Sequence, residues 1–161
     1  MNRDIIKVPE KAPEHDGRVI EETCLRANFS ASTILWNSNY YDDRDKGCWL
    51  NRGSTGSFTV DLFTEVPIKQ CQLRQTGNGT FLDYGTDDYA IDVSTDNEEW
   101  NQVFNGTLQA RISCHVTETA WIITPPKNSV ARYVRFRATS CHGDVRHASV
   151  KWLLIRRPRA S

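Results

Sequence analysis

The chain has 161 residues, of which 39% are hydrophobic and 25% are charged, so its length and composition are those of one globular domain. Twenty Lys and Arg residues balance twenty Asp and Glu residues. A formal net charge of zero argues against a general nucleic-acid binder, which needs a strong basic field. No apolar run reaches the length of a membrane span, so we expect no transmembrane segment.

The spacing of apolar residues predicts many short strands and no helix. A polar lead-in over residues 1–16 is expected to precede the domain, which we place at 17–157, and residues 158–161 are expected to form a C-terminal tail. Asn105-Gly106 is a strong hairpin signal, and the longest irregular stretch, 28–56, is a candidate functional loop. The predicted strands are, in chain order, 57–63, 68–74, 89–93, 100–104, 121–123, 133–138 and 150–154.

Alternation within these strands indicates which side chains point into the core. In the strand 57–63, Thr59 and Asp61 share one face and the apolar residues between and beside them share the other. Short strands separated by turn residues favour an all-β sandwich or jelly roll. The inward positions predicted in this way are Phe58, Val60, Leu62, Cys71, Leu73, Val134, Phe136, Ala138, Val150, Trp152 and Leu154.

The five cysteines leave the cellular compartment open. Their number is odd and none forms a Cys-x-x-Cys pair, which fits either a secreted domain with two disulfide bonds and one thiol or an intracellular domain with five buried thiols. Sequons at Asn28, Asn78 and Asn105 favour secretion, whereas residues 1–14 lack the apolar stretch of a signal peptide. We expect a secreted or cell-surface protein, with a cytoplasmic one as the alternative.

Several phrases of the sequence, in order along the chain, resemble those of one known family. Cys48-Trp49-Leu50 precedes a strand that ends in Val60-Asp61-Leu62, and Tyr89-Ala90-Ile91-Asp92-Val93-Ser94-Thr95-Asp96 is followed by Trp100. Ala131-Arg132-Tyr133-Val134-Arg135-Phe136 comes next, and then Gly143 and His147-Ala148-Ser149-Val150. Over about 18–155, the chain resembles the discoidin domains, also called coagulation factor 5/8 type C domains, of the galactose-binding-like superfamily.

This resemblance implies an eight-stranded antiparallel jelly-roll β-sandwich. It also implies a non-catalytic binding module, because family members bind sugars, phospholipid head groups or other proteins through loops at one end of the sandwich. No Gly-rich phosphate loop, His-Glu-x-x-His or Gly-x-Ser-x-Gly motif is present, so we expect no enzymatic activity.

Three loops hold the candidate ligand-binding residues. In the first, aromatic rings can stack on the CH faces of a sugar while amides and an arginine bond its hydroxyls; the alternative is that Trp36 belongs to the core. In the last, an arginine fork and two imidazoles can bond hydroxyls or an anion; the alternative is a loop satisfied by its own contacts, with His147 packed on the sheet edge. The candidates are Trp36, Asn37, Tyr40, Tyr41, Arg44, Arg74, Asn78, His142, Asp144, Arg146 and His147.

Two metal sites are considered. Asp42, Asp43 and Asp45 can supply oxygen ligands to calcium, and the alternative is a solvated acidic loop. The last strand has Ser149 and Lys151 where the resemblance to calcium-binding members of the family implies an acid, so calcium binding stays open. The repeated tripeptides at residues 113–115 and 140–142 offer two Cys and two His to zinc, but adjacent residues of a strand point to opposite faces, which disfavours that site.

The sequence therefore supports a carbohydrate-binding, lectin-like module in cell adhesion or recognition, with a glycan or glycoprotein as its partner. One alternative is a protein-protein interaction domain of the same fold, inside or outside the cell, such as the related Doc-type jelly roll of a ubiquitin ligase. Another is a phospholipid-binding discoidin domain, which needs apolar residues at its loop tips, and residues 34–36 are the candidates.

Overall fold

The computed structural model describes residues 17–24, 49–68, 70–75, 85–110, 119–122, 130–143, 147–150 and 152–156. These residues form strands and no helix, so none of them belongs to a helix that could cross a bilayer. The strands are β1 (Arg18–Glu22), β2 (Trp49–Leu50), β3 (Gly56–Pro67), β4 (Gln70–Arg74), β5 (Asp88–Ser94), β6 (Asn101–Thr107), β7 (Thr119–Ile122), β8 (Val130–Ala138), β9 (Ser149–Val150) and β10 (Trp152–Arg156).

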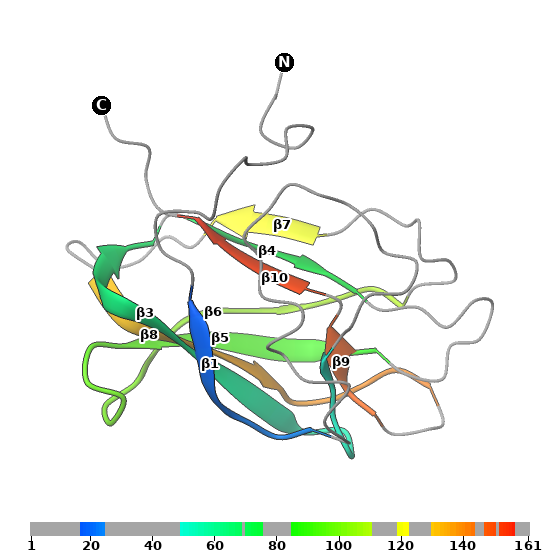
Figure 1. The fold of residues 1–161 in the computed structure, drawn as a ribbon. Coiled ribbons are helices and arrows are strands. Elements are labelled where there is room, and N and C mark those ends of the chain that lie inside the picture. The colour runs from blue at the N-terminus through cyan, green and yellow to red at the C-terminus, as the bar shows by residue number, and fades with distance from the viewer. Residues whose placement is uncertain are drawn as a thin grey trace, which may run out of the picture.

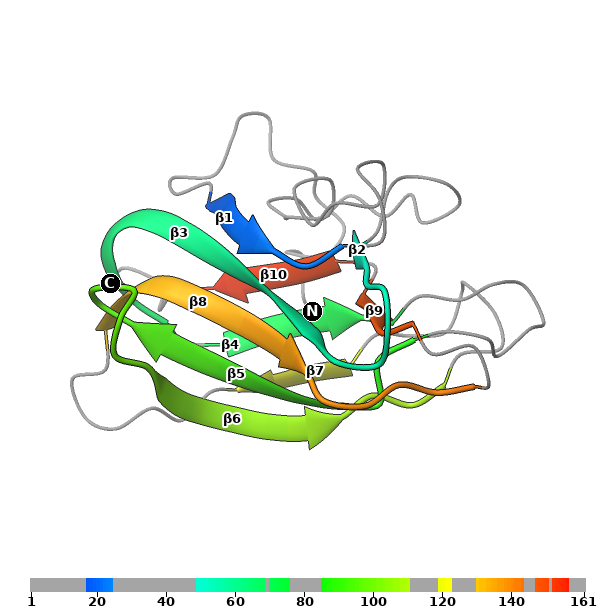
Figure 2. The ribbon, with the colours of Figure 1, turned by 90° about the horizontal axis from the view of Figure 1, so that it is seen from below.

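The strands pack as two layers (Figure 1). One layer is a five-stranded sheet in the order β1-β3-β8-β5-β6, and the other is a three-stranded sheet in the order β10-β4-β7. The short pair β2-β9 lies at one end of the sandwich, and the turn between β5 and β6 lies at the other (Figures 1 and 2). Because every strand pair is antiparallel, the predicted all-β antiparallel class is confirmed. The predicted number of eight strands is not confirmed, since the described residues form ten.

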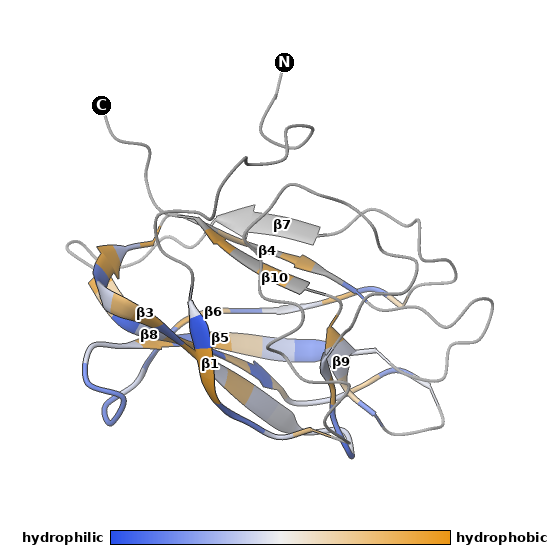
Figure 3. Cartoon of the chain, viewed as in Figure 1, coloured by the Kyte–Doolittle hydropathy of each residue, from blue (hydrophilic) through white to orange (hydrophobic). Residues whose placement is uncertain are grey.

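The core lies between the layers, and Figure 3 shows apolar residues in strands of both. Phe58 on β3 and Phe136 on β8 are register partners on adjacent strands, and their ring centroids are 5.4 Å apart. Trp49 packs edge-on against both rings, at 5.3 and 5.7 Å, and Tyr89 stacks on Phe136 at 5.5 Å. The alternation predicted for these strands is confirmed, because the predicted inward residues of β3, β4 and β8 are all buried.

The predicted hairpin at Asn105-Gly106 is wrong. Both residues lie inside β6, where Asn105 pairs with Ala90 and Gly106 pairs with Tyr89. Gly106 is needed there for space, since a Cβ atom would lie 2.9 Å from the ring of Phe104. The turn that joins β5 to β6 comes earlier, where the side chain of Ser94 accepts hydrogen bonds from the backbone N–H groups of Asp96 and Asn97.

The single last strand predicted for 150–154 is also wrong. Val150 belongs to β9 and pairs with Trp49, whereas β10 begins at Trp152 and pairs with β4. In β10 the buried residue is Leu153, opposite Leu73, so the inward positions are shifted by one from those that simple alternation predicts. The side chains of Trp152 and Leu154 lie outside the described part of the structure.

The other predicted strands occur with shifted ends, and two strands were missed. β1 contains two adjacent glutamates, and its polar and apolar residues do not alternate, so its sequence does not predict a strand. β2 has only two residues and lies within the stretch 28–56 that was predicted to be irregular. Both strands form because of partners that are distant in sequence, namely β3 for β1 and β9 for β2.

Asp61 lies on the side of the five-stranded sheet that faces away from the core, yet it is only 3% exposed. Its carboxylate accepts two hydrogen bonds from the Arg132 guanidinium, at 2.8 and 3.0 Å, and one from the backbone N–H of Phe63 at 2.8 Å. The bonds from Arg132 and then the Phe63 N–H outweigh burial and hold the pKa of Asp61 below its ordinary value.

Asp61 is expected to make the fold sensitive to acid. A carboxyl whose pKa is lowered by folding contributes stability above its ordinary pKa, near 3.8, and this stability is lost as the pH falls through the lower folded value. We therefore expect the Asp61→Asn variant to lose less stability between neutral pH and about pH 3 than the unchanged protein does. Urea unfolding at both pH values measures this. The exposed Glu65, changed to Gln, is the control, and an equal acid loss in the unchanged and Asp61→Asn proteins would contradict the prediction.

Candidate functional site

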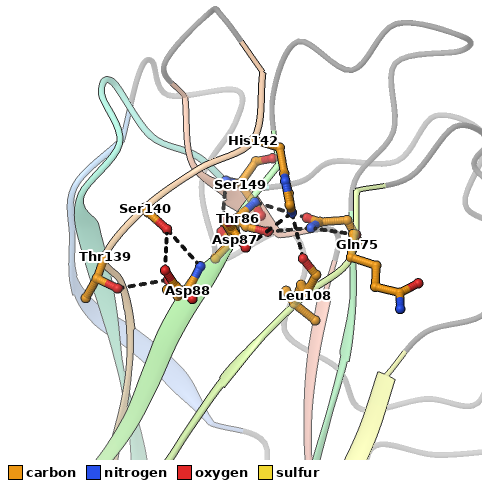
Figure 4. A network of polar contacts seen from close by, with 10 residues as sticks. Gln75, Thr86, Asp87, Asp88, Leu108, Thr139, Ser140, His142 and Ser149 are labelled. Carbon is orange, nitrogen blue, oxygen red and sulfur yellow. Dashed lines mark hydrogen bonds and ion pairs between the residues drawn. The ribbon is translucent and has the colours of Figure 1, made fainter.

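Several connecting segments meet at the end of the sandwich that carries β2 and β9. We call residues 51–56, 85–88, 139–143 and 147–149 the loop platform. Its segments are far apart in sequence but are joined by backbone hydrogen bonds: Asn51 N–H to Ala148 O, Gly85 N–H to His147 O, Thr86 N–H to Ser149 O and His142 N–H to Gly85 O. The platform is therefore one connected surface. Figure 4 shows its central part.

Thr86 is the central residue of the platform and is fully buried. Its hydroxyl donates to Ser149 O at 2.8 Å and accepts from Ser149 N–H at 3.2 Å. The buried side chain of Gln75 accepts from Thr86 N–H and donates to Thr86 O, so a side-chain amide serves as a strand partner (Figure 4). Next to it, Gly85 has a φ of 134°, a value that favours glycine.

Asn51 fixes the segment between β2 and β3. Its buried side-chain amide donates to the backbone oxygens of Arg52, Gly53 and Thr55, at 3.2, 2.9 and 2.7 Å, and its Oδ1 accepts from Thr23 Oγ1. A Cβ atom at Gly56 would lie 2.3 Å from Asn51 Oδ1, so only glycine fits there. These bonds wrap residues 51–56 around one side chain and leave the loop little freedom.

Two histidines lie on this platform, each with one ring nitrogen bonded to a backbone oxygen. His142 Nε2 is 2.6 Å from Leu108 O and 3.6 Å from Asp87 Oδ1, and His147 Nδ1 is 3.1 Å from Asn51 O. A carbonyl oxygen only accepts, so each of these nitrogens carries the proton and donates. In the neutral rings, His142 Nδ1 and His147 Nε2 are then acceptors without a partner among the described residues.

Asp88 and Ser140 join β5 to the segment after β8. Ser140 Oγ donates to Asp88 Oδ2 at 2.9 Å and accepts from Asp88 N–H at 3.0 Å, while Thr139 Oγ1 donates to Asp88 O (Figure 4). The carboxylate, the backbone N–H and the backbone carbonyl of Asp88 are thus all engaged within the platform. This fixes where residues 140–143 leave the sheet and therefore where His142 lies.

Of the predicted ligand-binding residues, the structure describes three. His142 and His147 lie together on the platform, and Arg74 ends β4, with its side chain outside the described part. His147 donates a hydrogen bond to a backbone oxygen, as the alternative of a loop satisfied by its own contacts predicts, and its Nε2 is still available as an acceptor. The other candidates lie outside the described residues: Trp36, Asn37, Tyr40, Tyr41, Arg44, Asn78, Asp144 and Arg146, together with the possible calcium ligands Asp42, Asp43 and Asp45.

Sequence reasoning missed Asn51, Gln75 and Thr86. These three side chains build the platform, but nothing in their local sequence marks them as different from exposed polar residues. Their partners lie far along the chain, 63 residues away for the bond from Thr86 to Ser149 and 96 for that between His147 and Asn51. The one available signal was Gly53 with Gly56, because two glycines after a buried strand indicate a constrained loop.

The described cysteines and acids form no metal site. Cys71 is buried in the core, and burial raises the pKa of its thiol, which stays protonated. No disulfide joins Cys24, Cys71 and Cys141 to one another, whereas Cys48 and Cys114 lie outside the described residues. Within the described ranges, no three His, Cys, Asp or Glu side chains gather as metal ligands would.

Comparison with known proteins agrees with this fold. The family model of the F5/8 type C domain matches residues 28–156. No curated protein matches the chain. A solved carbohydrate-binding module, CBM32-3 from a family 31 glycoside hydrolase of Clostridium perfringens, is 19% identical with a TM-score of 0.70, covering 89% of this chain and 92% of its own.

Two further structures are solved with sugars. The family 32 module of C. perfringens NanJ, in complex with galactose, is 16% identical with a TM-score of 0.62, covering 86% of this chain and 91% of its own. A CBM32 module of C. perfringens GH89, in complex with GalNAc-β-1,3-galactose, is 12% identical with a TM-score of 0.63, covering 87% and 94%. At these identities the structures establish the class of fold, a galactose-binding-like β-sandwich. The chain belongs to the F5/8 type C domain family.

Proposed function

We propose that this domain binds carbohydrate, without catalysis, through the loops at the platform end. One observation carries the proposal. The three segments that contain the other predicted binding residues begin and end at described residues that are gathered there: 25–48 between Cys24 and Trp49, 76–84 between Gln75 and Gly85, and 144–146 between Gly143 and His147. The short bond from Trp49 Nε1 to Thr23 O and the bonds of Gln75 and Gly85 tie these ends together.

The chemistry of the candidate binding residues suits sugar hydroxyls. A sugar hydroxyl both donates and accepts hydrogen bonds. It therefore fits a site in which an imidazole nitrogen that only accepts lies beside groups that only donate. His142 Nδ1 and His147 Nε2 are such acceptors, and we propose Arg44 and Arg146, whose guanidiniums only donate, as the donors. Tyr40 and Tyr41 offer rings for stacking. Sites of this kind bind weakly one by one, and we expect multivalent display to raise the affinity.

Exposure of the purified protein to a glycan array, with and without calcium, is the first test. We expect binding to a related set of glycans. Tyr41→Ala and Arg146→Ala should each weaken this binding about tenfold or more, the size of a lost stacking or charge-assisted contact. Glu98→Gln, at the opposite end of the sandwich, is the control and should change nothing. A blank array in both conditions would contradict the proposal and direct attention to a protein partner or to phospholipid vesicles.

Calcium is a separate part of the proposal. We assign Asp42, Asp43 and Asp45 as its ligands, since carboxylate oxygens are what Ca²⁺ prefers. If this is right, chelation lowers glycan binding and added calcium restores it, and Asp43→Asn has the same effect as chelation. Glycan binding that is indifferent to chelation would leave a solvated acidic loop as the correct interpretation.

We also propose that the domain works outside the cell or on its surface, in adhesion or recognition, where glycans are displayed. The three sequons fit this setting. A count of reactive thiols in the unfolded protein tests it: one thiol indicates secretion with two disulfide bonds, and five indicate a reducing compartment.

A further inference from the structure

The five-stranded sheet has a second polar surface on the side that faces away from the core. Register places Glu21, Thr59, Arg135, Asp92 and Gln102 side by side across β1, β3, β8, β5 and β6. The next row along the strands holds Ser57, Arg137, Ala90 and Asn105. We call these two rows the outer face. No residue in them is a large hydrophobic one.

A buried carboxylate lies at the centre of the outer face. The side chain of Asp92 is only 2% exposed because two guanidiniums cover it. Arg135 Nε and Nη2 lie 2.9 and 2.8 Å from Asp92 Oδ2. Arg137 Nε lies 3.0 Å from Oδ2, and its Nη2 lies 3.2 Å from Oδ1 and 3.0 Å from Gln102 Oε1. One carboxylate thus orients two arginines in a fixed arrangement.

The Arg135 guanidinium is also held from the side. It lies over the Trp100 ring, 4.2 Å from the ring centroid. Stacking on an indole together with two contacts to a carboxylate fixes the plane of the guanidinium, so little rotamer entropy remains to be lost when a ligand binds. The cluster is therefore preorganised, unlike a pair of ordinary surface arginines.

The cluster keeps a positive charge and hydrogen-bond donors that its own contacts do not use. Two guanidiniums and one carboxylate leave one positive charge, and the Nη1 group of each arginine has no partner among the described residues. The side chains of Arg135 and Arg137 are 27% and 37% exposed, so these groups can be reached from solvent. A second carboxylate would balance the charge and accept charge-assisted hydrogen bonds from the remaining Nη1 donors.

We propose that the outer face is a second ligand site, separate from the loop platform, which binds the carboxylate of a uronic acid residue in a polysaccharide. The carboxylate would lie on Arg135 and Arg137, and the exposed side-chain amide of Gln102 would bond a neighbouring hydroxyl. A ring that carries hydroxyls beside its carboxylate uses both groups, which favours a sugar acid over an acidic peptide. The lack of large apolar residues in the two rows disfavours a lipid surface. Glu21 and Asp88 border the cluster and limit where an anion can bind.

Nuclear magnetic resonance tests the proposal directly. Oligogalacturonate is titrated into ¹⁵N-labelled protein, and the same oligomer with its carboxyl groups reduced to alcohols serves as the neutral probe. We expect the charged oligomer to shift the amides of Arg135, Arg137 and Gln102, the neutral one to leave them unchanged, and the effect to weaken with added salt. Shifts confined to His142 and His147, or none at all, would overturn the proposal.

Variants separate this site from the platform. Arg137→Gln should weaken oligogalacturonate binding about tenfold or more, and Arg137→Lys by less, because Lys keeps the charge but loses the fork. Arg18→Gln removes the same charge from β1, two strands away, and should have little effect. Equal weakening by Arg137→Gln and Arg18→Gln would show a nonspecific charge effect and refute the site. Because the array tests the platform through Tyr41 and Arg146, whereas the titration reports on Arg135, Arg137 and Gln102, failure on the array and failure here are independent results.

Discussion

Replacing Phe136 with Ala is expected to lower the free energy of unfolding by about 3–5 kcal/mol, the range for truncation of a fully buried ring. Phe136 has no exposed surface and contacts the rings of Trp49, Phe58 and Tyr89 at once. These rings come from β2, β3 and β5, so the cavity would open between the five-stranded sheet, which holds β3, β5 and β8, and the short strand β2. Urea unfolding followed by tryptophan fluorescence measures the change.

The same substitution at Phe63 is the matched control. Phe63 is 51% exposed and has a φ of 73°, so its ring adds little to the core and its backbone is strained. We expect Phe63→Ala to change stability by less than about 1 kcal/mol, as exposed substitutions usually do. If the two variants were equally destabilised, the ring cluster around Phe136 would not be the centre of the core.

The core could be predicted because alternation is a local property. Phe58, Val60 and Leu62 identify the inward face of β3 with no knowledge of any other strand, and Val134 and Phe136 do the same for β8. The signal fails where the chain changes sheet. Val150 and Leu153 are both buried, but they belong to two strands that pair with different partners, so one alternation cannot describe them.

Burial of polar residues on the side of the five-stranded sheet that faces away from the core could not be predicted either. By alternation, Asp61 and Asp92 are surface positions. They are buried because arginines from β8 cover them. Arg132 covers Asp61 from 71 residues away in the sequence, and Arg135 covers Asp92 from 43 residues away. The candidate site shows the same limit. His142 and His147 were found from a polar loop sequence, whereas the platform that holds them depends on long-range bonds.

Changing Asn51 to Asp is expected to have the second large effect, and one that reaches the platform. The substitution keeps the shape of the side chain but replaces amide hydrogens by a carboxylate that faces three backbone oxygens. We expect a loss of about 2–4 kcal/mol at neutral pH, from two or three buried hydrogen bonds at about 1 kcal/mol each plus repulsion. Denaturant unfolding provides the measurement, with Asn51→Ala as the comparison that lacks the charge.

The pH dependence distinguishes this mechanism from simple loss of packing. Carbonyl oxygens around the new carboxyl raise its folded pKa above its unfolded value, so the variant is most stable below the unfolded pKa and loses stability as the pH rises through the folded one. Asn51→Asp should therefore recover towards the unchanged protein at about pH 4, relative to Asn51→Ala, which should not. Because Asn51 O also accepts the hydrogen bond from His147 Nδ1, glycan binding at neutral pH should fall together with stability. Stability of Asn51→Asp that matched Asn51→Ala at every pH would show that the amide hydrogens do not hold the loop, and that the platform is fixed by its backbone bonds alone.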